Sequence, residues 1–226
     1  DFHFQIQFVT DTIINPDKLL GQATSACLNH QQHQRYFHGI IKRIREIDSP
    51  SLPLRCYSMS LCPTVSLLSL HQDCRTHQHQ SVLEIAQAYF THFGINHIDC
   101  SMLTNTYPKL DYVVQYNESA WDFIKRLFSE HGIFYYFTFT EDSHQLVLAD
   151  STSCYQYNAT CWPLGEQANL HVQSFSERFI PHPTAFDLIN SSAERSGKVL
   201  QYSQAATQAE AQQQTLYPEQ FSQQDQ

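Results

Sequence analysis

The sequence is poor in charged residues. Asp, Glu, Lys and Arg make up 15% of its 226 residues, against about 25% in typical soluble domains. The 22 acidic residues outnumber the 13 basic ones, and the formal net charge is −9. Lys42, Arg43 and Arg45 form a short basic cluster that alternates with isoleucines, as a solvent-facing or subunit-facing strand would. Nucleic-acid binding needs a broader cationic surface to neutralise phosphates, so we expect no nucleic-acid partner.

Long apolar runs are also missing. No stretch approaches the roughly 18 consecutive apolar residues of a membrane span, and no charged start followed by an apolar run marks a signal peptide. The sequence therefore predicts no membrane span and no Sec-type export. The chain starts at Asp1 within an alternating apolar and polar pattern, Phe2 to Phe8, that is typical of a half-buried strand. We therefore expect a fragment of a longer protein.

The glycine and cysteine motifs of several enzyme classes are absent. The chain has only six glycines, with no G-x-S-x-G sequence and no Gly-rich phosphate loop. Its seven cysteines are an odd number and include no C-x-x-C pair. We interpret them as reduced, buried or partly buried thiols of a protein made in the cytosol. They are Cys27, Cys56, Cys62, Cys74, Cys100, Cys154 and Cys161.

What is present is mainly β-type sequence. Residues 1–62 read as three strands, the alternating start, residues 35–47 and residues 52–62, with turn residues between them. Residues 133–139 and 145–150 flank a short polar turn and predict a β-hairpin. A further strand is expected from His171. The Gln-rich tail from Gln201 is expected to be a short helix or a linker.

Two segments predict capped helices, over residues 81–93 and 119–131. Ser81 with Glu84, and Ser119 with Asp122, are spaced as capping pairs. Each helix is predicted to end at a glycine in the left-handed conformation, thirteen residues after its first cap residue and directly before an isoleucine. The apolar residues fall on one face of each helix. They are Val82, Ile85, Ala86, Tyr89, Phe90 and Phe93 in the first helix, and Phe123, Ile124, Leu127 and Phe128 in the second.

Glu118 and Asp122 also invite a catalytic interpretation. Glycosidases use a pair of carboxylates, and Trp121 between them could stack on a sugar. Helix capping and the helix dipole already explain both carboxylates, however, because acidic side chains are favoured at a helix N-terminus. Catalysis by this pair is the less favoured alternative.

Histidine-rich stretches raise the question of a metal site. One set is His71, Cys74, His77 and His79, and another is His30, His33 and His38. Structural zinc sites favour ligand pairs at short spacing with a second pair farther along the chain. Neither set has that frame, so we expect no metal ligands, no cofactor and no catalytic residues.

A series of segments follows the order found in a known family. They are Arg35–Ile40, Pro63–Leu70, the helix from Ser81, Tyr107–Pro108, Asp111–Ser119, Gly132–Phe137 and His144–Ser151, and more weakly Pro183–Asp187 and Tyr217–Pro218. In these residues the chain resembles the VgrG family, the spike proteins of the bacterial type VI secretion system and relatives of contractile-phage hubs. Ala120, His131 and Arg75–Gln78 depart from the family pattern.

The resemblance implies a structural protein. It implies the hub-like head of a spike, in which β-barrel-type subdomains of three subunits form a ring, with no catalytic residues. Such a homotrimer would cap the hexameric Hcp tube and contact the secretion baseplate, and an effector is a further partner that the family allows. The protein would be cytoplasmic before firing and then be secreted into the medium or a target cell. The small β-barrel and the β-helix needle of full-length family members are not visible in these residues.

The expected fold class is α+β and mostly β, with β-barrel-type subdomains of the phage tail hub kind and the two capped helices. We expect a first β-barrel-type segment at 1–75, a helix and hairpin segment at 76–160, and a returning β segment with a Gln-rich linker at 161–226. Two alternatives stay open. One is a phage or prophage baseplate hub, and the other is a hydrolase or metal-binding domain.

Overall fold

The computed structural model describes residues 1–30, 33–47, 54–155, 176, 185–191, 199–205 and 213–216. Their contacts divide the chain into two compact units, Asp1–Tyr155 and Gln156–Gln226. The finer three-part division expected from the sequence stays a prediction.

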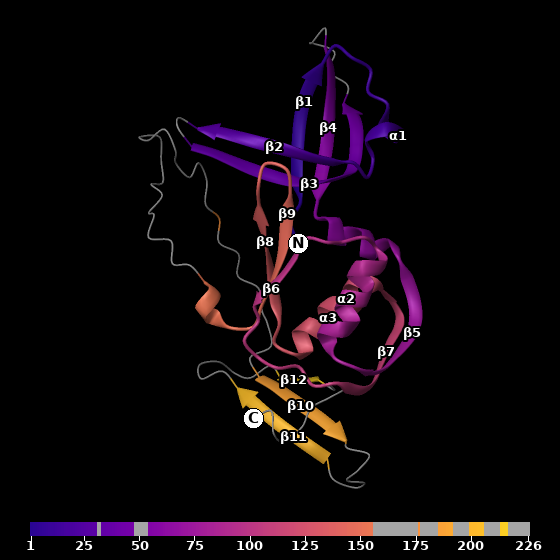
Figure 1. Ribbon diagram of the computed structural model, residues 1–226, viewed down its shortest axis with the longest axis vertical. Helices are drawn as coiled ribbons and strands as arrows, with labels where there is room; N and C mark the ends of the chain where they lie inside the picture. Colours follow the sequence, from indigo (N-terminus) through magenta and orange to yellow (C-terminus); the bar gives the residue numbers. More distant parts are fainter. Residues whose placement is uncertain are drawn as a thin grey trace. The chain divides into compact units, whose positions relative to one another are not determined.

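A four-stranded antiparallel sheet opens the first unit. Its order is β1-β4-β3-β2, with β1 at Phe4–Thr10, β2 at Ala23–His30, β3 at His33–Ile47 and β4 at Arg55–Cys62 (Figure 1). A one-turn helix, α1 (Pro16–Leu19), lies between β1 and β2. The strands expected at the start, at 35–47 and before Pro63 are therefore confirmed. The sequence did not predict β2, whose residues ATSACLNH have a weak apolar pattern.

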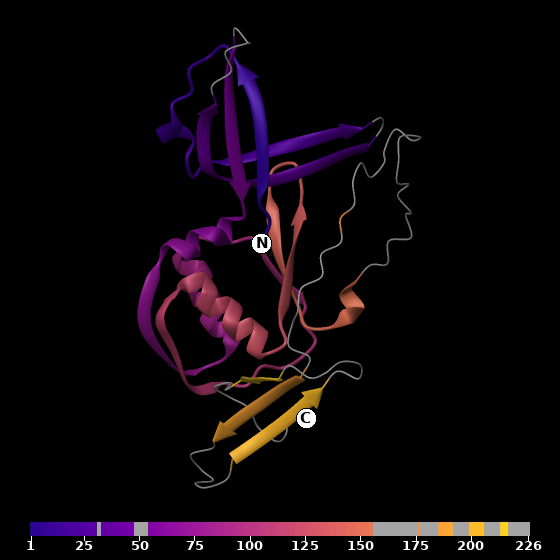
Figure 2. The ribbon, with the colours of Figure 1, turned by 180° about the vertical axis from the view of Figure 1, so that it is seen from behind.

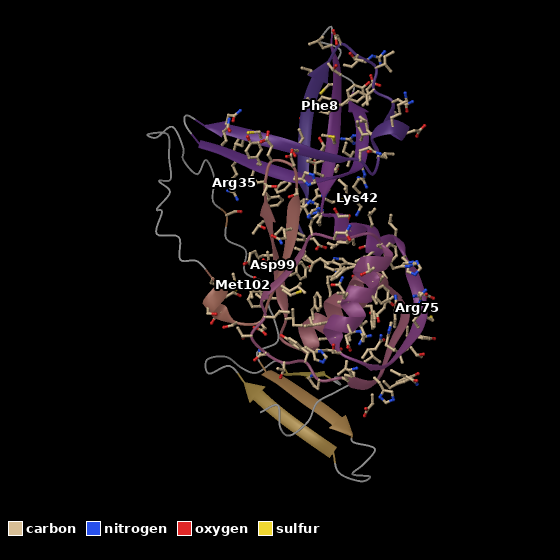
Figure 3. All side chains as sticks on the ribbon, in the orientation of Figure 1. Phe8, Arg35, Lys42, Arg75, Asp99 and Met102 are labelled. Carbon is tan, nitrogen blue, oxygen red and sulfur yellow. The ribbon has the colours of Figure 1, made fainter. Side chains whose placement is uncertain are left out.

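The long strand β3 is shared between two partners. Its first half pairs with β2 and its second half pairs with β4, with a register shift between Ile41 and Arg43. Such a bulge bends a strand and increases its twist. Lys42, labelled in Figure 3, lies at this bulge, and Lys42, Arg43 and Arg45 are all exposed. The interpretation of these cations as a surface-facing set is confirmed.

The two predicted helices form as α2 (Val82–His92) and α3 (Ala120–Glu130). Ser81 and Glu84 make a complete capping box. At α3 the Ser119 hydroxyl accepts the Asp122 amide at 3.1 Å, but the Asp122 carboxylate accepts that hydroxyl at 2.6 Å and not a backbone amide. Ser119 is also the last residue of a strand, where it pairs with Gln72.

Both helices end in the same motif. Gly94 and Gly132 each have φ +68°, and the next residue's amide reaches back to the carbonyl five residues earlier, at 2.8 Å in both helices. This is the Schellman closure, which needs a residue that tolerates the left-handed region. Ile95 and Ile133, which follow the glycines, are buried. The repeated plan seen in the sequence is confirmed.

The helices lie between two strand layers. On one side are β5 (Gln72–Gln80) and β7 (Leu110–Ser119), which pair antiparallel, and on the other is the sheet β6-β9-β8. The last three strands are Ile98–Met102, His144–Ala149 and Phe134–Phe139, so the predicted hairpin is β8–β9. Figures 1 and 2 show α2 and α3 side by side between these layers. A 3-10 helix, η1 (Thr64–Leu70), connects β4 to β5.

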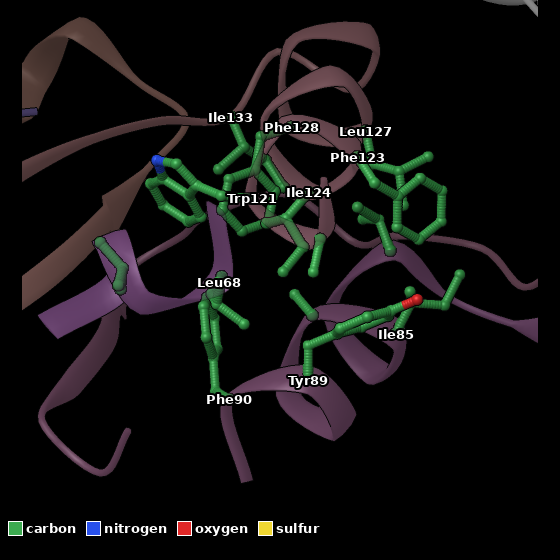
Figure 4. Close-up of a cluster of buried hydrophobic side chains, with 14 of the residues drawn as sticks. Leu68, Ile85, Tyr89, Phe90, Trp121, Phe123, Ile124, Leu127, Phe128 and Ile133 are labelled. Carbon is green, nitrogen blue, oxygen red and sulfur yellow. The ribbon is translucent and has the colours of Figure 1, made fainter. Parts of the chain in front are cut away.

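The core of the first unit forms where the two helices meet. Trp121, Phe123 and Phe128 of α3 pack with Phe90 of α2, and each is at most 1% exposed (Figure 4). The buried faces are the ones that the helical spacing predicted, and Phe93 is partly buried. A helix this short is marginal alone, so the burial of these faces carries most of its stability.

The second unit has a three-stranded sheet of order β11-β10-β12, formed by Ala185–Ser191 (β10), Val199–Ala205 (β11) and Gln213–Leu216 (β12). The expectation of a short helix or linker from Gln201 is wrong for residues 201–205 and 213–216, which are strand. Ladder pairing uses backbone groups, so a Gln-rich segment can complete a sheet without an apolar pattern. In the first unit, Thr152–Cys154 forms a short 3-10 helix, η2. The strand expected from His171 lies outside the described residues, apart from residue 176.

Candidate functional site

Ion pairs hold the stretch that contains Glu118 and Asp122, the two carboxylates considered for catalysis. Glu118 lies at the end of β7, and its carboxylate receives Arg126 Nη2 of α3 at 2.8 Å. The same guanidinium donates to the Val114 carbonyl at 2.9 Å and to Glu130 at 3.3 Å. Glu118 therefore connects the strand to the helix.

Asp122 is occupied as well. Its carboxylate accepts the Ser119 hydroxyl and lies 2.8 Å from Lys125 Nζ. The Lys125 ammonium, followed by the Ser119 hydroxyl, holds the pKa of Asp122 below its ordinary value. A general acid needs the opposite shift, towards neutral pH. The residues that suggested a hydrolase are thus arranged as helix-end contacts.

Trp121 is not a surface platform. Its side chain is 1% exposed, and its indole nitrogen donates to the Asp1 carboxylate at 2.9 Å. Tyr135 of β8 donates to the same carboxylate at 3.1 Å. Asp1 therefore joins the start of the chain to α3 and β8, a contact between residues more than a hundred positions apart that the sequence did not suggest.

A buried polar chain connects β7 with α2. Gln115 is completely buried; its side-chain oxygen accepts the Tyr89 hydroxyl, and its nitrogen donates to the Glu118 carbonyl at 2.9 Å. The Tyr89 hydroxyl also lies 3.3 Å from His77 Nε2 of β5. Burial raises the pKa of Tyr89. Satisfied buried networks of this kind specify one packing arrangement, so we assign this one a structural role.

The histidines of the first metal hypothesis lie in separate environments. His71 packs on Phe93 and lies 3.7 Å from Asp73, whereas His77 stacks on Phe123. The side chain of His79 is 80% exposed. Cys74 accepts the Asn117 amide through its sulfur at 3.4 Å. In the part of the chain that the structure describes, no three His, Cys, Asp or Glu side chains are placed to share a metal ion.

The histidines of the second set, His30, His33 and His38, also lie in separate environments. His30 and His33 are paired through their backbones on β2 and β3, while His38 faces His144 of β9, with their Nδ1 atoms 2.8 Å apart. No sequence pattern pointed to this pair, because its members are 106 residues apart. His144 is 7% exposed and also receives the Thr64 amide.

The six described cysteines are free thiols, and Cys161 lies outside the described residues. Cys62 is buried and Cys56 and Cys154 are partly buried, as expected. The expectation is wrong for Cys27, Cys74 and Cys100, which are exposed. All three lie on strands that form an edge of their sheets, β2, β5 and β6, where a small side chain can face outward.

The surface of the first unit carries open strand edges and exposed apolar side chains. In the described sheets, β1, β2, β5, β6, β7 and β8 each lack a partner along one edge. Tyr112 and Tyr116 on β7 are 51% and 78% exposed, and Leu70 just before β5 is 77% exposed. Arg75 on β5 and Met102 on β6 also lie at such edges (Figure 3). Open edges invite pairing with another chain.

A shallow apolar groove of about 600 Å³ lies beside one of these edges. Leu83, Gln87 and Thr91 of α2 form one wall, and Ile98 and Cys100 of the edge strand β6 form the other. An apolar groove beside an open edge suits contact with protein more than chemistry on a small molecule. The arrangement of the first unit therefore favours an interaction function.

Comparison with known proteins agrees with this view. The whole chain, residues 1–226, matches the family described as phage tail baseplate hub (GPD). The chain belongs to this hub family.

Relatives of this hub chain include the type VI secretion system spike protein VgrG1b of Pseudomonas aeruginosa. The two are 32% identical over 157 residues, which are 69% of this chain and 21% of the relative. The VgrG resemblance read from the sequence is therefore confirmed. The chain spans about a fifth of the length of the curated relatives it matches first.

Solved structures show the same fold. The E. coli c3393 protein, described as a type VI secretion component with structural similarity to the T4 tail proteins gp27 and gp5, matches with a TM-score of 0.62 at 25% identity. The match covers 69% of this chain and 44% of that one. The 43 kDa tail protein of prophage MuSo2 from Shewanella oneidensis matches with a TM-score of 0.61 at 13% identity. The match covers 97% of this chain and 65% of the prophage protein. The mostly β, hub-type fold class is confirmed.

Among the described residues no helix has the length and apolar character needed to cross a membrane.

Proposed function

We propose that this hub chain is part of the base of a type VI secretion spike. In this proposal three copies form a ring that caps the hexameric Hcp tube, contacts the baseplate and leaves the cell with the tube. The observation that carries the proposal is the 32% identity with a type VI spike protein over 157 residues, within a chain that matches the hub family along its whole length. Synthesis in the cytoplasm, export to the medium or a target cell, and carriage of an effector belong to the same proposal.

The proposed role is structural and not catalytic. Membership of a baseplate hub family supports this role. So does the engagement of Glu118, Asp122 and Trp121, each of which is held in a contact that joins elements of the first unit. A carboxylate already paired with a cation and a helix end is a poor general acid.

The surface of the first unit is compatible with subunit contacts. A ring subunit presents strand edges and broad, weakly charged faces to its neighbours. The open edges of β5, β6 and β7 and the exposed tyrosines of β7 supply such features. Only 15% of the residues are charged, so few charged side chains have to be desolvated in such contacts.

One observation favours a second candidate, the hub of a prophage tail. The Shewanella prophage tail protein matches 97% of this chain, whereas the VgrG1b alignment covers 69%. The low identity of the prophage protein, 13%, means that this likeness supports the fold and leaves the machine open. Both candidates predict a ring that caps a tube. They differ in whether that tube is made of Hcp or of a phage tail-tube protein.

A binding experiment separates the two candidates. The purified chain would be mixed with Hcp from the same genome and, in parallel, with a phage tail-tube protein from that genome. Type VI function predicts a complex with the Hcp hexamer alone, seen by size-exclusion chromatography with light scattering. Binding to the tail-tube protein alone would favour the prophage hub. Binding to neither would contradict a tube-capping role.

A further inference from the structure

The contact between β3 and the β8–β9 hairpin has two histidines at its centre. His38 of β3 and His144 of β9 place their Nδ1 atoms 2.8 Å apart, with the ring centroids 5.1 Å apart. His144 is 7% exposed, so its ring is almost completely withdrawn from water. The contact joins the first sheet to the hairpin that packs on the helices.

The partners of His144 fix its charge. The backbone amide of Thr64 points at His144 Nε2 at 3.0 Å, and the Thr64 hydroxyl lies 3.2 Å from the same nitrogen. An amide can only donate, so Nε2 must accept, and the ring is then neutral with its proton on Nδ1. That proton is donated to His38 Nδ1, which must also be an acceptor. The geometry is therefore satisfied only when both rings are neutral.

A second proton on His144 would disrupt the bond from the Thr64 amide. It would sit on Nε2, where it would face the Thr64 amide hydrogen. A proton on His38 Nδ1 would likewise face the His144 N–H. In the first case the Thr64 hydroxyl, 3.2 Å from Nε2, could accept the new proton, but the Thr64 amide would lose its acceptor. In the second case two N–H donors would oppose each other. A buried donor without an acceptor is costly.

The surroundings give little compensation for a positive charge. Among the described residues, the titratable groups acting on His144 are His38 of β3 and His97 of the loop before β6. Asp142, in the hairpin turn, is the acidic group acting nearby, and it acts on His38. The rings of Phe2 and Phe137 pack edge-on against His144, at 5.6 and 6.1 Å between centroids. Burial first, and then the two histidines, lower the pKa of His144 to about 4.

The rest of the contact is mainly aromatic. Phe139 of the hairpin packs against Phe2, Phe4 and Phe37, and the Ser25 hydroxyl of β2 donates to the Glu141 carbonyl. Phenyl rings do not titrate. The two histidines therefore give this contact its response to pH.

We propose that the contact between β3 and the β8–β9 hairpin is an acid-sensitive joint, which opens when His144 takes up a second ring proton. The joint holds when both rings are neutral and loosens on acidification, so that the hairpin separates from the first sheet while the helix core stays folded. The proposal is independent of the hub function, since it uses only contacts within residues 1–155.

The pH window follows from linkage. His144 has a lower pKa in the folded chain than the ordinary 6.5 it regains when the joint opens, so the open state binds more protons below pH 6.5. Stability of the joint is complete above that value and is lost as pH falls towards 4. With these two values, the opening equilibrium at pH 5 is about 30-fold larger than it would be without titration of His144, and about 20-fold larger than at pH 7.

Five carboxylates of the first unit titrate below this window. Asp73, Asp99, Asp122, Asp150 and Glu84 all have pKa values below their ordinary ones, because each is held by hydrogen bonds to its charged form. These groups stay ionised between pH 6.5 and 4.5. A change of stability within that range therefore does not come from these five groups, and the comparison with His144→Gln assigns it to histidine.

The test compares the wild type with His144→Gln and a control. Glutamine can accept the Thr64 amide and donate to His38, but it does not titrate. His79→Gln is the matched control, because His79 is an exposed histidine on β5. Amide hydrogen exchange would be compared between proteins at the same pH. At pH 5 we expect Thr64 and the hairpin amides to exchange roughly 30-fold faster in the wild type and in His79→Gln than in His144→Gln, with no such difference at pH 7.

Two results would overturn the proposal. One is equal exchange at pH 5 in the wild type and His144→Gln. The other is an acid-induced increase that is the same in α2 and α3 as in the hairpin, which would mean general unfolding. If His144→Gln does not fold, the ring of His144 can be titrated by NMR in the unmodified protein. A midpoint below about pH 5 supports the proposal, and a midpoint near 6.5 contradicts it.

Discussion

At the scale of single residues, a backbone constraint explains the glycines at the two helix ends, and a charge pair explains the role of Glu118. Gly132 and Gly94 close the two helices with positive φ, and a Cβ at either glycine would meet no other atom within 4 Å. The need for glycine there is conformational and not a matter of space. Glu118 acts differently, through its ion pair with Arg126, which adds to the helix-dipole effect expected from the sequence.

We predict that Gly132→Val destabilises the fold more than Glu118→Ala does. A β-branched residue in the left-handed region costs at least about 1 to 2 kcal/mol. Removing the Glu118 carboxylate costs about 1 kcal/mol or less, because Arg126 keeps Glu130 and the Val114 carbonyl as partners. Chemical denaturation measures the loss in the free energy of unfolding for both variants. Gly94→Val is the matched control and should cost as much as Gly132→Val. A larger loss for Glu118→Ala would show that the ion pair outweighs the helix closure.

Gly39→Ala is predicted to destabilise the first sheet for a different reason. Gly39 has ordinary φ, but a Cβ there would lie 2.8 Å from the backbone carbonyl oxygen of Cys62 on β4. Neighbouring backbone has to move, at a cost of about 1 to 3 kcal/mol. Comparing the free energy of unfolding of Gly39→Ala with that of the wild type checks this prediction. A variant as stable as the wild type would mean that β3 and β4 can separate locally without loss.

At the scale of elements, local signals allowed prediction and long-range pairing did not. α2 and α3 were predicted to within a residue because cap residues, apolar spacing and the closing glycine all lie inside each segment. β5 was not predicted, since its sequence QDCRTHQHQ contains no large apolar residue and becomes a strand by pairing with β7. The contacts of the candidate site also fall into local ones, which could be predicted, and long-range ones, which could not. Capping of Asp122 could be predicted, but the contacts of Trp121 with Asp1 and of His38 with His144 join residues more than a hundred positions apart.

The loop before β7 provides a test at this scale. The Asp150 carboxylate, directly after β9, accepts the amides of Thr104 and Asn105 and the Tyr107 hydroxyl, at 2.7 to 2.9 Å. These bonds to its charged form lower the pKa of Asp150. Burial, followed by the same carboxylate, raises the pKa of Tyr107. We predict that Asp150→Ala increases hydrogen exchange at Thr104 and Asn105 with little change in α2 or α3. Asp111→Ala, at a fully exposed side chain, is the control and should leave the loop unchanged. Unaltered exchange in Asp150→Ala would show that the loop is held by other contacts.

At the scale of the whole molecule, the described surface is suited to assembly. Its sheets are open, β7 exposes two tyrosines, and an apolar groove lies beside the edge of β6. Contacts of this kind are satisfied in a ring of identical subunits, where each copy offers one surface and receives another. Membership of the baseplate hub family gives these features a shared explanation. The acid-sensitive joint adds that the hairpin is held to the first sheet by a contact that weakens below neutral pH.

The most direct measurement of the central claim is the mass of the chain in solution, by light scattering over a concentration series at pH 7.5. A hub chain that carries its own ring contacts is expected to reach three times the 26.2 kDa of a single copy as concentration rises. A mass that stays at 26.2 kDa up to the highest soluble concentration would contradict the claim that these 226 residues carry the contacts of the ring.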